Sequence, residues 1–199
     1  MSFWDRIAGF YDISQSINGK VYSEMLDITQ RLVPEGAKVL DTAAGTGALS
    51  FAAAKKAAEV VCTDLSLPML DRARKKAVAK GVDNIRFEAR NIFDLADEDE
   101  TYDIVMAGNV LHLLSAPQKA VRELCRVTKK GGLILLPTFM TKRQPVTLKL
   151  YKVIGYSSES DYSPKEYVQM LRESGCGRVK AKLIKGMIPC CYAIIKKTN

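Results

Sequence analysis

The chain has 199 residues, of which 47% are hydrophobic and 26% are charged. This length and apolar content are enough for the core of one domain of ordinary size, which excludes global disorder. No run approaches the roughly 18 uninterrupted apolar residues of a membrane-spanning helix, so the sequence predicts none. The first residues lack a basic head followed by an apolar run, which favours a cytoplasmic protein over a secreted one.

Charge is distributed unevenly along the chain, whose formal net charge is +8. Residues 1–100 carry 13 basic and 16 acidic side chains, whereas residues 101–199 carry 17 and 6. An excess of this kind is typical of a protein with an anionic partner, and equally of a solvated, lysine-rich surface. Charge alone therefore leaves an anionic substrate or surface open.

The five cysteines show no metal-binding spacing, and they are expected to be reduced and mostly buried. Cys190 and Cys191 are adjacent and in principle suit a soft ion such as arsenite. In a strand, however, neighbouring side chains point to opposite faces, which argues against a shared site.

Short apolar runs alternate with longer amphipathic stretches over most of the chain. Strands are predicted at 38–41, 59–64, 84–89, 102–107 and 133–136, and helices at 48–58, 68–80 and 117–128, the last ending before Gly131-Gly132. Alternating strands and helices predict an α/β fold with a mostly parallel sheet covered by helices on both faces.

The C-terminal part departs from this rhythm. A helix is predicted to open at Ser163, with Glu166 completing a capping box. Two apolar runs, 178–184 and 189–196, then follow without a helix between them, so the tight connection at Lys185-Gly186 predicts an antiparallel hairpin. We expect one domain over 1–199, with an N-terminal helical part (1–33), a core (34–137), an insert (138–162) and a C-terminal helix and hairpin (163–199).

The most informative segment follows the first strand and reads Asp41-Thr42-Ala43-Ala44-Gly45-Thr46-Gly47. In an open α/β sheet, ligands bind outside the carboxyl ends of the strands, and the glycines allow close backbone approach there. A dinucleotide is disfavoured, because the turn is not G-x-G-x-x-G and Asp41 would repel a pyrophosphate. The same carboxylate would attract an ammonium or sulfonium group. Asp64, at the end of the second strand, suits the hydroxyls of a ribose.

Further segments complete a pattern that spans nearly the whole chain. They are Ile7 to Asp12, Asp64-Leu65-Ser66 with Met69-Leu70, Tyr102 to Val105, Val110-Leu111-His112, Gly131-Gly132 and Gly186 to Pro189. In order and spacing the chain resembles class I S-adenosylmethionine (SAM)-dependent methyltransferases. It is most similar to the branch that contains the ubiquinone/menaquinone biosynthesis C-methyltransferases. The resemblance implies a Rossmann-like seven-stranded sheet, SAM as cofactor and S-adenosylhomocysteine as product.

The resemblance also implies roles for individual residues. Asp41, Gly45 and Gly47, in the loop that includes Ala43, would hold the methionine moiety, and Asp64 the ribose. The other implied contacts are Leu65 and Met69 around the adenine, Asn91 and Ile92 at its edge, and Asn109 below the methionine end. Residues 1–33 would form an N-terminal helical lid over the cofactor.

Some positions depart from the family pattern. Ala43 and Ala44 replace glycines, although the quinone branch also has alanine at the first position, and Asn91 replaces an aspartate. The Arg-Asn motif of the quinone enzymes is missing beyond the fourth predicted strand. We therefore expect the cofactor to be shared, but not a quinone substrate.

Two residues are candidates for catalysis. His112, the single histidine, lies just past the fourth predicted strand, where a proton acceptor would be well placed. It could equally pack or cap the next helix. Tyr11, in the expected lid, either lines the site or lies on an amphipathic helix. Methyl transfer is an in-line displacement that alignment and desolvation accelerate without a protein nucleophile.

Three functions remain open at this stage. The first is methyl transfer to a small molecule, for which the basic second half hints at an anionic acceptor. The second is RNA methylation, which is disfavoured because no base-methylation signature and no RNA-binding appendage are found. The third is a non-catalytic module that binds SAM. No metal is predicted, and the oligomeric state is not determined by the sequence.

Overall fold

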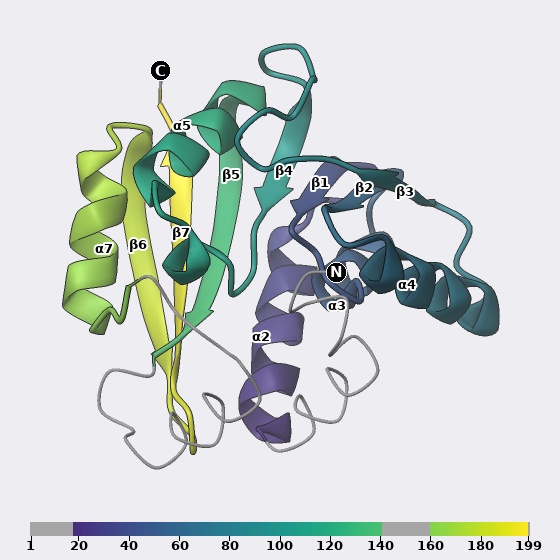
Figure 1. Ribbon diagram of the computed structural model, residues 1–199, viewed down its shortest axis with the longest axis horizontal. Helices are drawn as coiled ribbons and strands as arrows, with labels where there is room; N and C mark the ends of the chain where they lie inside the picture. Colours follow the sequence, from purple (N-terminus) through teal and green to yellow (C-terminus); the bar gives the residue numbers. More distant parts are fainter. Residues whose placement is uncertain (1–17, 141–159, 199) are drawn as a thin grey trace.

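A computed structural model describes residues 18–140 and 160–198 (Figure 1). The elements in chain order are α2 (Gly19–Leu32), β1 (Lys38–Thr42), α3 (Ala48–Ala54), β2 (Glu59–Asp64), α4 (Leu67–Lys80), β3 (Ile85–Ala89), β4 (Tyr102–Met106), the 3-10 turn η1 (Leu111–Leu113), α5 (Pro117–Val127), β5 (Thr128–Phe139), α7 (Pro164–Glu173), β6 (Gly177–Ile184) and β7 (Cys190–Lys197). The predicted lid residue Tyr11 and most of the predicted insert lie outside the described residues.

The strands form one seven-stranded sheet in the order β3-β2-β1-β4-β5-β7-β6. Strands β1 to β5 pair in parallel, and β7 pairs antiparallel with β5 on one side and β6 on the other. The order reverses at β1, from which the chain proceeds first toward β3 and then toward β4. The predicted mostly parallel sheet and the predicted C-terminal hairpin are both confirmed.

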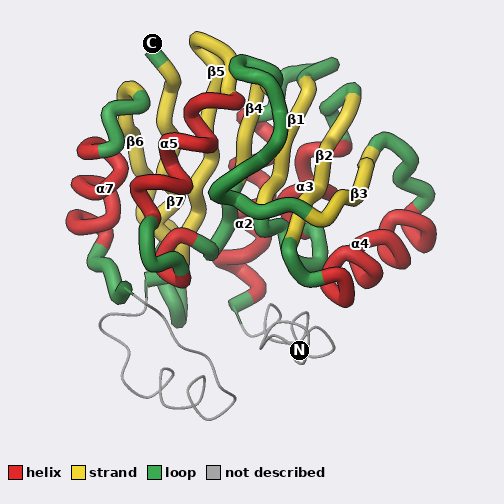
Figure 2. The backbone as a smooth tube through the Cα atoms, turned by 45° about the horizontal axis from the view of Figure 1, so that its top comes forward, coloured by secondary structure: helices red, strands yellow, loops and turns green. Residues whose placement is uncertain are grey.

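Helices cover both faces of the sheet, as the alternating pattern predicts. Helices α5 and α7 lie in front of the strands in Figure 2, whereas α2 and α3 lie behind them. Adjacent strand residues belong to opposite core layers: Val39 packs on the α2–α3 side and Leu40 on the α5–α7 side. Cys190 and Cys191 are separated in the same way, which supports the expectation that they do not form a shared site.

Local sequence signals explain several helix ends. Ser66 caps α4 by accepting a hydrogen bond from the Met69 amide, and Gly81 ends that helix at a left-handed φ of 62°. The capping box predicted for Ser163 and Glu166 is present at the start of α7. Over the described parts of the chain, none of the helices is both long and apolar enough to cross a membrane.

Two predicted elements have different bounds in the structure. Helix α3 ends at Ala54 instead of Ala58, because the chain turns there to meet the segment before β1. The Lys56 carbonyl accepts a hydrogen bond from the Gly36 amide, and the Ala58 amide donates to the Ala37 carbonyl. These tertiary bonds take the place of another helical turn.

Strand β5 is longer than predicted, from Thr128 to Phe139. The Gly131-Gly132 pair lies inside it, near an irregularity in the pairing with β4. A Cβ on Gly132 would approach the Asp103 carbonyl oxygen to 2.7 Å, so the close passage of the two strands requires glycine there. Gly131 and Gly132, which were expected to follow the end of the helix before them, therefore lie within β5 and allow it to begin before the predicted residue 133.

Candidate functional site

A cavity of about 200 Å³ lies where β1, β2 and β4 end, beside the point at which the strand order reverses. This is the place at which open α/β sheets bind ligands. Most of its lining comes from the loops that follow these strands. The lining residues are Ala43, Gly45, Asp64, Leu65, Met69, Arg90, Ile92, Gly108, Asn109, Val110, Leu113 and Leu114.

Asp64 fixes the shape of the loop after β1. Its carboxylate accepts a hydrogen bond from the Gly45 amide at 2.8 Å and another from the Ser66 amide, also at 2.8 Å. The loop after β1 and the start of α4 are thus held by one carboxylate at the cavity wall. A carboxylate has about four acceptor positions, so a group of this kind suits hydrogen bonds from several donors, ligand hydroxyls among them.

The loop after β1 uses left-handed backbone conformations. Ala43 has φ of 50°, and Gly47 has φ of 81°. A Cβ on Gly47 would lie 3.3 Å from both the Ala73 Cβ and the Phe51 ring, so glycine lets α3 and α4 approach each other. Ala43 adopts a conformation that suits glycine better, which is consistent with its replacing a family glycine.

A second, smaller hollow of about 20 Å³ adjoins the first and is closed by Tyr22 and Met25 of α2. The two hollows share Ala43, Gly108 and Asn109 in their linings. Because their linings overlap, the two hollows adjoin, and we refer to them together as the recess.

Asp41 lines the smaller hollow and is completely buried. One carboxylate oxygen, Oδ2, accepts a hydrogen bond from the Ser50 hydroxyl at 2.6 Å. The other, Oδ1, has no hydrogen-bond partner among the described residues. Burial raises the pKa of Asp41 to about 7, while the bond from Ser50 opposes this shift. A buried carboxylate with an unsatisfied oxygen fits a ligand that brings a cationic donor.

Asn109 lies at the junction of the two hollows. Its side-chain oxygen accepts a hydrogen bond from the backbone amide of Phe139 at 2.8 Å. The backbone amide of Asn109 donates to the Pro137 carbonyl, also at 2.8 Å. The residue has a left-handed φ of 54°, held by these bonds to the end of β5. Gly108 precedes it, and a Cβ there would lie 2.7 Å from the Leu49 Cδ1 atom.

The predicted adenine contacts divide into two groups. Leu65, which is 69% exposed, and the buried Met69 and Ile92 all line the larger cavity. Asn91 does not line it: its side-chain oxygen accepts a hydrogen bond from the Phe93 amide at 3.0 Å, and the residue is exposed.

His112 is buried in η1 and lines neither of the two hollows formed by the described residues. Its backbone carbonyl accepts a hydrogen bond from the Ser160 amide at 3.1 Å. Burial lowers the pKa of His112 to about 4, although the charge of Asp161 opposes the shift. The imidazole is therefore neutral at physiological pH.

This pKa predicts how acid affects the protein. Since the folded-state pKa is lower than the ordinary value of 6.5, His112 contributes stability that is present above pH 6.5 and is lost as the pH falls toward 4. Between pH 7 and pH 4 the unfolding free energy of the wild type should fall. In His112→Gln, which has no imidazole to protonate, we expect this fall to be smaller by up to about 3 kcal/mol. Urea unfolding of both proteins at several pH values measures this; parallel curves would contradict it.

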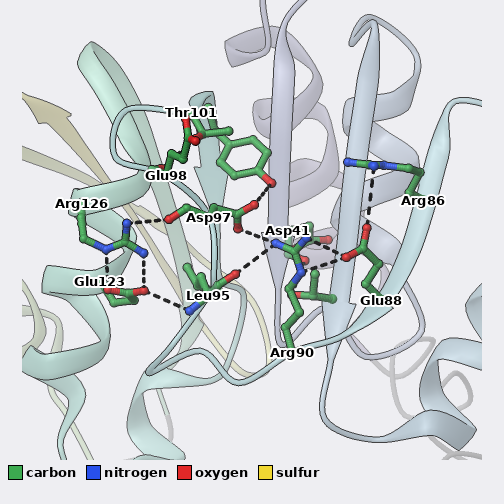
Figure 3. A network of polar contacts seen from close by, with 12 residues as sticks. Asp41, Arg86, Glu88, Arg90, Leu95, Asp97, Glu98, Thr101, Glu123 and Arg126 are labelled. Carbon is green, nitrogen blue, oxygen red and sulfur yellow. Dashed lines mark hydrogen bonds and ion pairs between the residues drawn. The ribbon is translucent and has the colours of Figure 1, made fainter.

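Sequence reasoning missed several residues of the larger cavity: Arg90, Gly108, Val110, Leu113 and Leu114. Arg90 is the most informative of them. Figure 3 shows its guanidinium group between Glu88, Asp97 and the Leu95 carbonyl. Among the described residues that line the recess it is the sole cation.

Comparison with known proteins identifies the family of the chain. Residues 34–175 match a family model described as a methyltransferase domain. The chain belongs to this methyltransferase domain family. The predicted membership of class I SAM-dependent methyltransferases is confirmed, and SAM is the cofactor that this membership assigns to the chain.

Individual relatives agree with this assignment. The demethylmenaquinone methyltransferase of Clavibacter sepedonicus is 31% identical over 153 residues, which are 75% of this chain and 62% of that protein. The C-methyltransferase UbiE of ubiquinone/menaquinone biosynthesis in Zymomonas mobilis is 29% identical over 151 residues, again 62% of its own length. The chain thus spans about three-fifths of these relatives.

Solved structures show the same fold at lower identity. A SAM-dependent methyltransferase from Thermotoga maritima superposes with a TM-score of 0.76 at 18% identity, with 99% of each chain covered. This similarity supports the fold, whereas the family assignment rests on the match over residues 34–175.

Proposed function

We propose that this chain transfers the methyl group of SAM to a small organic acceptor and releases S-adenosylhomocysteine. The observation that carries the proposal is the recess at the carboxyl ends of β1, β2 and β4, with Asp64 in one part and the buried Asp41 in the other. Within a methyltransferase-family chain, this placement of one carboxylate in each hollow suits the ribose and the ammonium group of one extended cofactor. SAM, when bound, supplies an electrophilic methyl group on a sulfonium.

The residues of the recess divide into three groups in this proposal. Asp41 pairs with the ammonium group of the methionine moiety, and Asp64 accepts hydrogen bonds from the ribose. Leu65, Met69 and Ile92 enclose the base. Ala43 and Gly45 of the loop after β1, together with Asn109, line the methionine end. Gly47 lines neither hollow and stands at the start of α3, so its predicted contact with the methionine moiety stays a prediction.

Apolar side chains beyond β4 complete the site for the acceptor. Val110, Leu113 and Leu114 line the cavity next to Asn109. Such a wall excludes water and holds the acceptor in line with the methyl group, which is what a displacement at carbon requires. His112 lies outside both hollows, so we propose that alignment rather than this histidine provides most of the acceleration. Tyr11, outside the described residues, stays a predicted lid contact.

The names of relatives motivate the choice of a small-molecule acceptor, since two of them are named for demethylmenaquinone and for ubiquinone/menaquinone biosynthesis. The apolar wall suits an acceptor with an apolar part. The anionic character of the acceptor, the single-domain organisation and the cytoplasmic location remain predictions.

The deciding experiment combines calorimetry with a methyl-transfer assay. The purified protein should bind SAM and S-adenosylhomocysteine, and should move labelled methyl from SAM into compounds of a metabolite extract. If neither cofactor form binds, the proposal fails. Binding without transfer would favour the non-catalytic module, and label appearing in RNA would favour the RNA methyltransferase.

Asp64→Ala tests the ribose contact. We expect the affinity for S-adenosylhomocysteine to fall by about 1–3 kcal/mol, because a hydrogen-bond acceptor is lost and Gly45 is no longer held. Asp71→Ala is the matched control, since Asp71 pairs with Arg74 on the exposed surface of α4. Equal affinities of the two variants would remove Asp64 from the site.

A further inference from the structure

The purine end of the recess contains an unexpected charged group. Leu65, Met69 and Ile92 provide an apolar wall beside Asp64, and Arg90 completes the lining there. If Asp64 accepts the ribose hydroxyls, the flat, weakly polar base lies against this apolar wall and within reach of Arg90. This step rests on the proposed function.

The guanidinium group of Arg90 is held on several sides. Its Nε and Nη2 atoms donate to the same Glu88 oxygen at 3.0 and 2.6 Å, and its Nη1 atom donates to the Leu95 carbonyl at 3.2 Å and to Asp97. Asp97 in turn accepts a hydrogen bond from the hydroxyl of the buried Tyr102 at 2.9 Å. A guanidinium has five N–H donors. Four of them are used by these contacts, so one N–H on Nη2 remains among the parts of the chain that the structure describes.

Asn91, the residue after Arg90, is not among the residues that line the cavity. Its side-chain oxygen is engaged by the Phe93 amide, in a short turn that includes the Asn91–Asp94 bridge. Beside Asp64, the polar side chain that lines this end of the cavity is therefore Arg90, which offers hydrogen-bond donors.

We propose that Arg90 recognises the base, donating its remaining Nη2 N–H to an acceptor atom on the edge of the purine. The two carboxylates Glu88 and Asp97 hold the group in place and balance its charge. A donor on the protein requires an acceptor on the base, and it does not require the 6-amino group of adenine. The site consequently also accepts a 6-oxo purine, which presents oxygen and ring-nitrogen acceptors.

The first test needs no variant. Calorimetry of the intact chain compares S-adenosylhomocysteine with S-inosylhomocysteine, in which an oxygen replaces the 6-amino group. We expect the two affinities to agree within about tenfold, the equivalent of one hydrogen bond. A loss of more than 100-fold with S-inosylhomocysteine would mean that the site distinguishes the 6-amino edge from the 6-oxo edge, and would overturn the proposal.

The second test uses Arg90→Lys, which keeps the positive charge but cannot reproduce the planar fork of donors. We expect its affinity for S-adenosylhomocysteine to fall roughly 10- to 100-fold. Arg86→Lys is the matched control, because Arg86 lies on β3, the strand that directly precedes Arg90, pairs with Glu59 and Glu88, and is absent from the cavity lining. Asn91→Ala should also leave the affinity unchanged.

The outcomes separate this inference from the proposed function. If the intact chain binds S-adenosylhomocysteine while Arg90→Lys matches Arg86→Lys, Arg90 has no role in recognition and the function stands. If Asn91→Ala is the variant that loses affinity, the base edge is read by Asn91 and the inference is wrong. If the intact chain bound neither SAM nor S-adenosylhomocysteine, both the inference about Arg90 and the proposed function would be wrong.

Discussion

Replacing Asp41 with asparagine is expected to weaken SAM binding by about 2–5 kcal/mol while making the ligand-free protein more stable at pH 8. Both effects follow from one buried carboxylate with a free Oδ1 atom. The ammonium group of the cofactor would pair with this charge, so its removal costs affinity. Without ligand, the same charge lies in a low-dielectric interior and opposes folding.

The pH dependence gives the sign of the stability effect. The folded-state pKa of Asp41 is about 7, above its ordinary value of 3.8. The group therefore contributes stability that is complete below pH 3.8 and is lost as the pH rises through about 7. Since one pKa unit corresponds to about 1.4 kcal/mol, the asparagine variant should gain up to a few kcal/mol of unfolding free energy at pH 8.

Two measurements check this prediction. Urea unfolding of the ligand-free proteins should show that the unfolding free energy of the variant, relative to that of the wild type, is higher at pH 8 than at pH 5. Calorimetry should show SAM affinity of the wild type increasing between pH 6 and pH 8, with a flat profile for the variant. Asp71→Asn, on the exposed face of α4, is the control. A variant that binds SAM normally would exclude Asp41 from the site.

The second large effect is expected at Gly177, the first residue of β6. Its backbone φ of 151° is one that residues other than glycine rarely adopt. A Cβ at this position would lie 2.1 Å from the Lys196 carbonyl oxygen of β7. Because this neighbour is backbone within a strand pair, it cannot move aside. Gly177→Ala should cost at least about 3 kcal/mol of unfolding free energy.

Gly175 provides a matched control two residues earlier. Its φ of 72° is also left-handed, but a Cβ there would meet no atom within 4 Å. Gly175→Ala should therefore cost only about 1–2 kcal/mol, from backbone strain alone. Denaturant unfolding of the two variants measures the difference; equal losses would mean that the contact with Lys196 is relieved at little cost.

Much of the fold could be predicted from local patterns, because each pattern reflects a contact near in sequence. The strand–loop–helix unit around Asp41 and Gly47 and the capping box at Ser163 are of this kind. The length of β5 and the early end of α3 could not, since they depend on the Asp103 carbonyl and on the segment at Gly36. These partners are distant in the chain, and no local pattern reports them.

The site shows the same division. Asp64, Met69 and Ile92 line the cavity, as the family resemblance implied. Arg90 was missed because an arginine after a strand normally indicates a solvated surface, and only the folded chain brings Asp97 and the Leu95 carbonyl around it. His112 looked well placed in the sequence, but burial in η1 keeps its side chain out of both hollows.

The position of β7 between β5 and β6 has a consequence for biosynthesis. Residues of β6 leave the ribosome before those of β7, yet they reach the sheet only through pairs such as Val179 with Ile195. The outer edge of β5 stays unpaired until residues 190–197 have been made. A nascent chain stalled before them would expose an apolar strand edge, and is the species on which we expect chaperones to act.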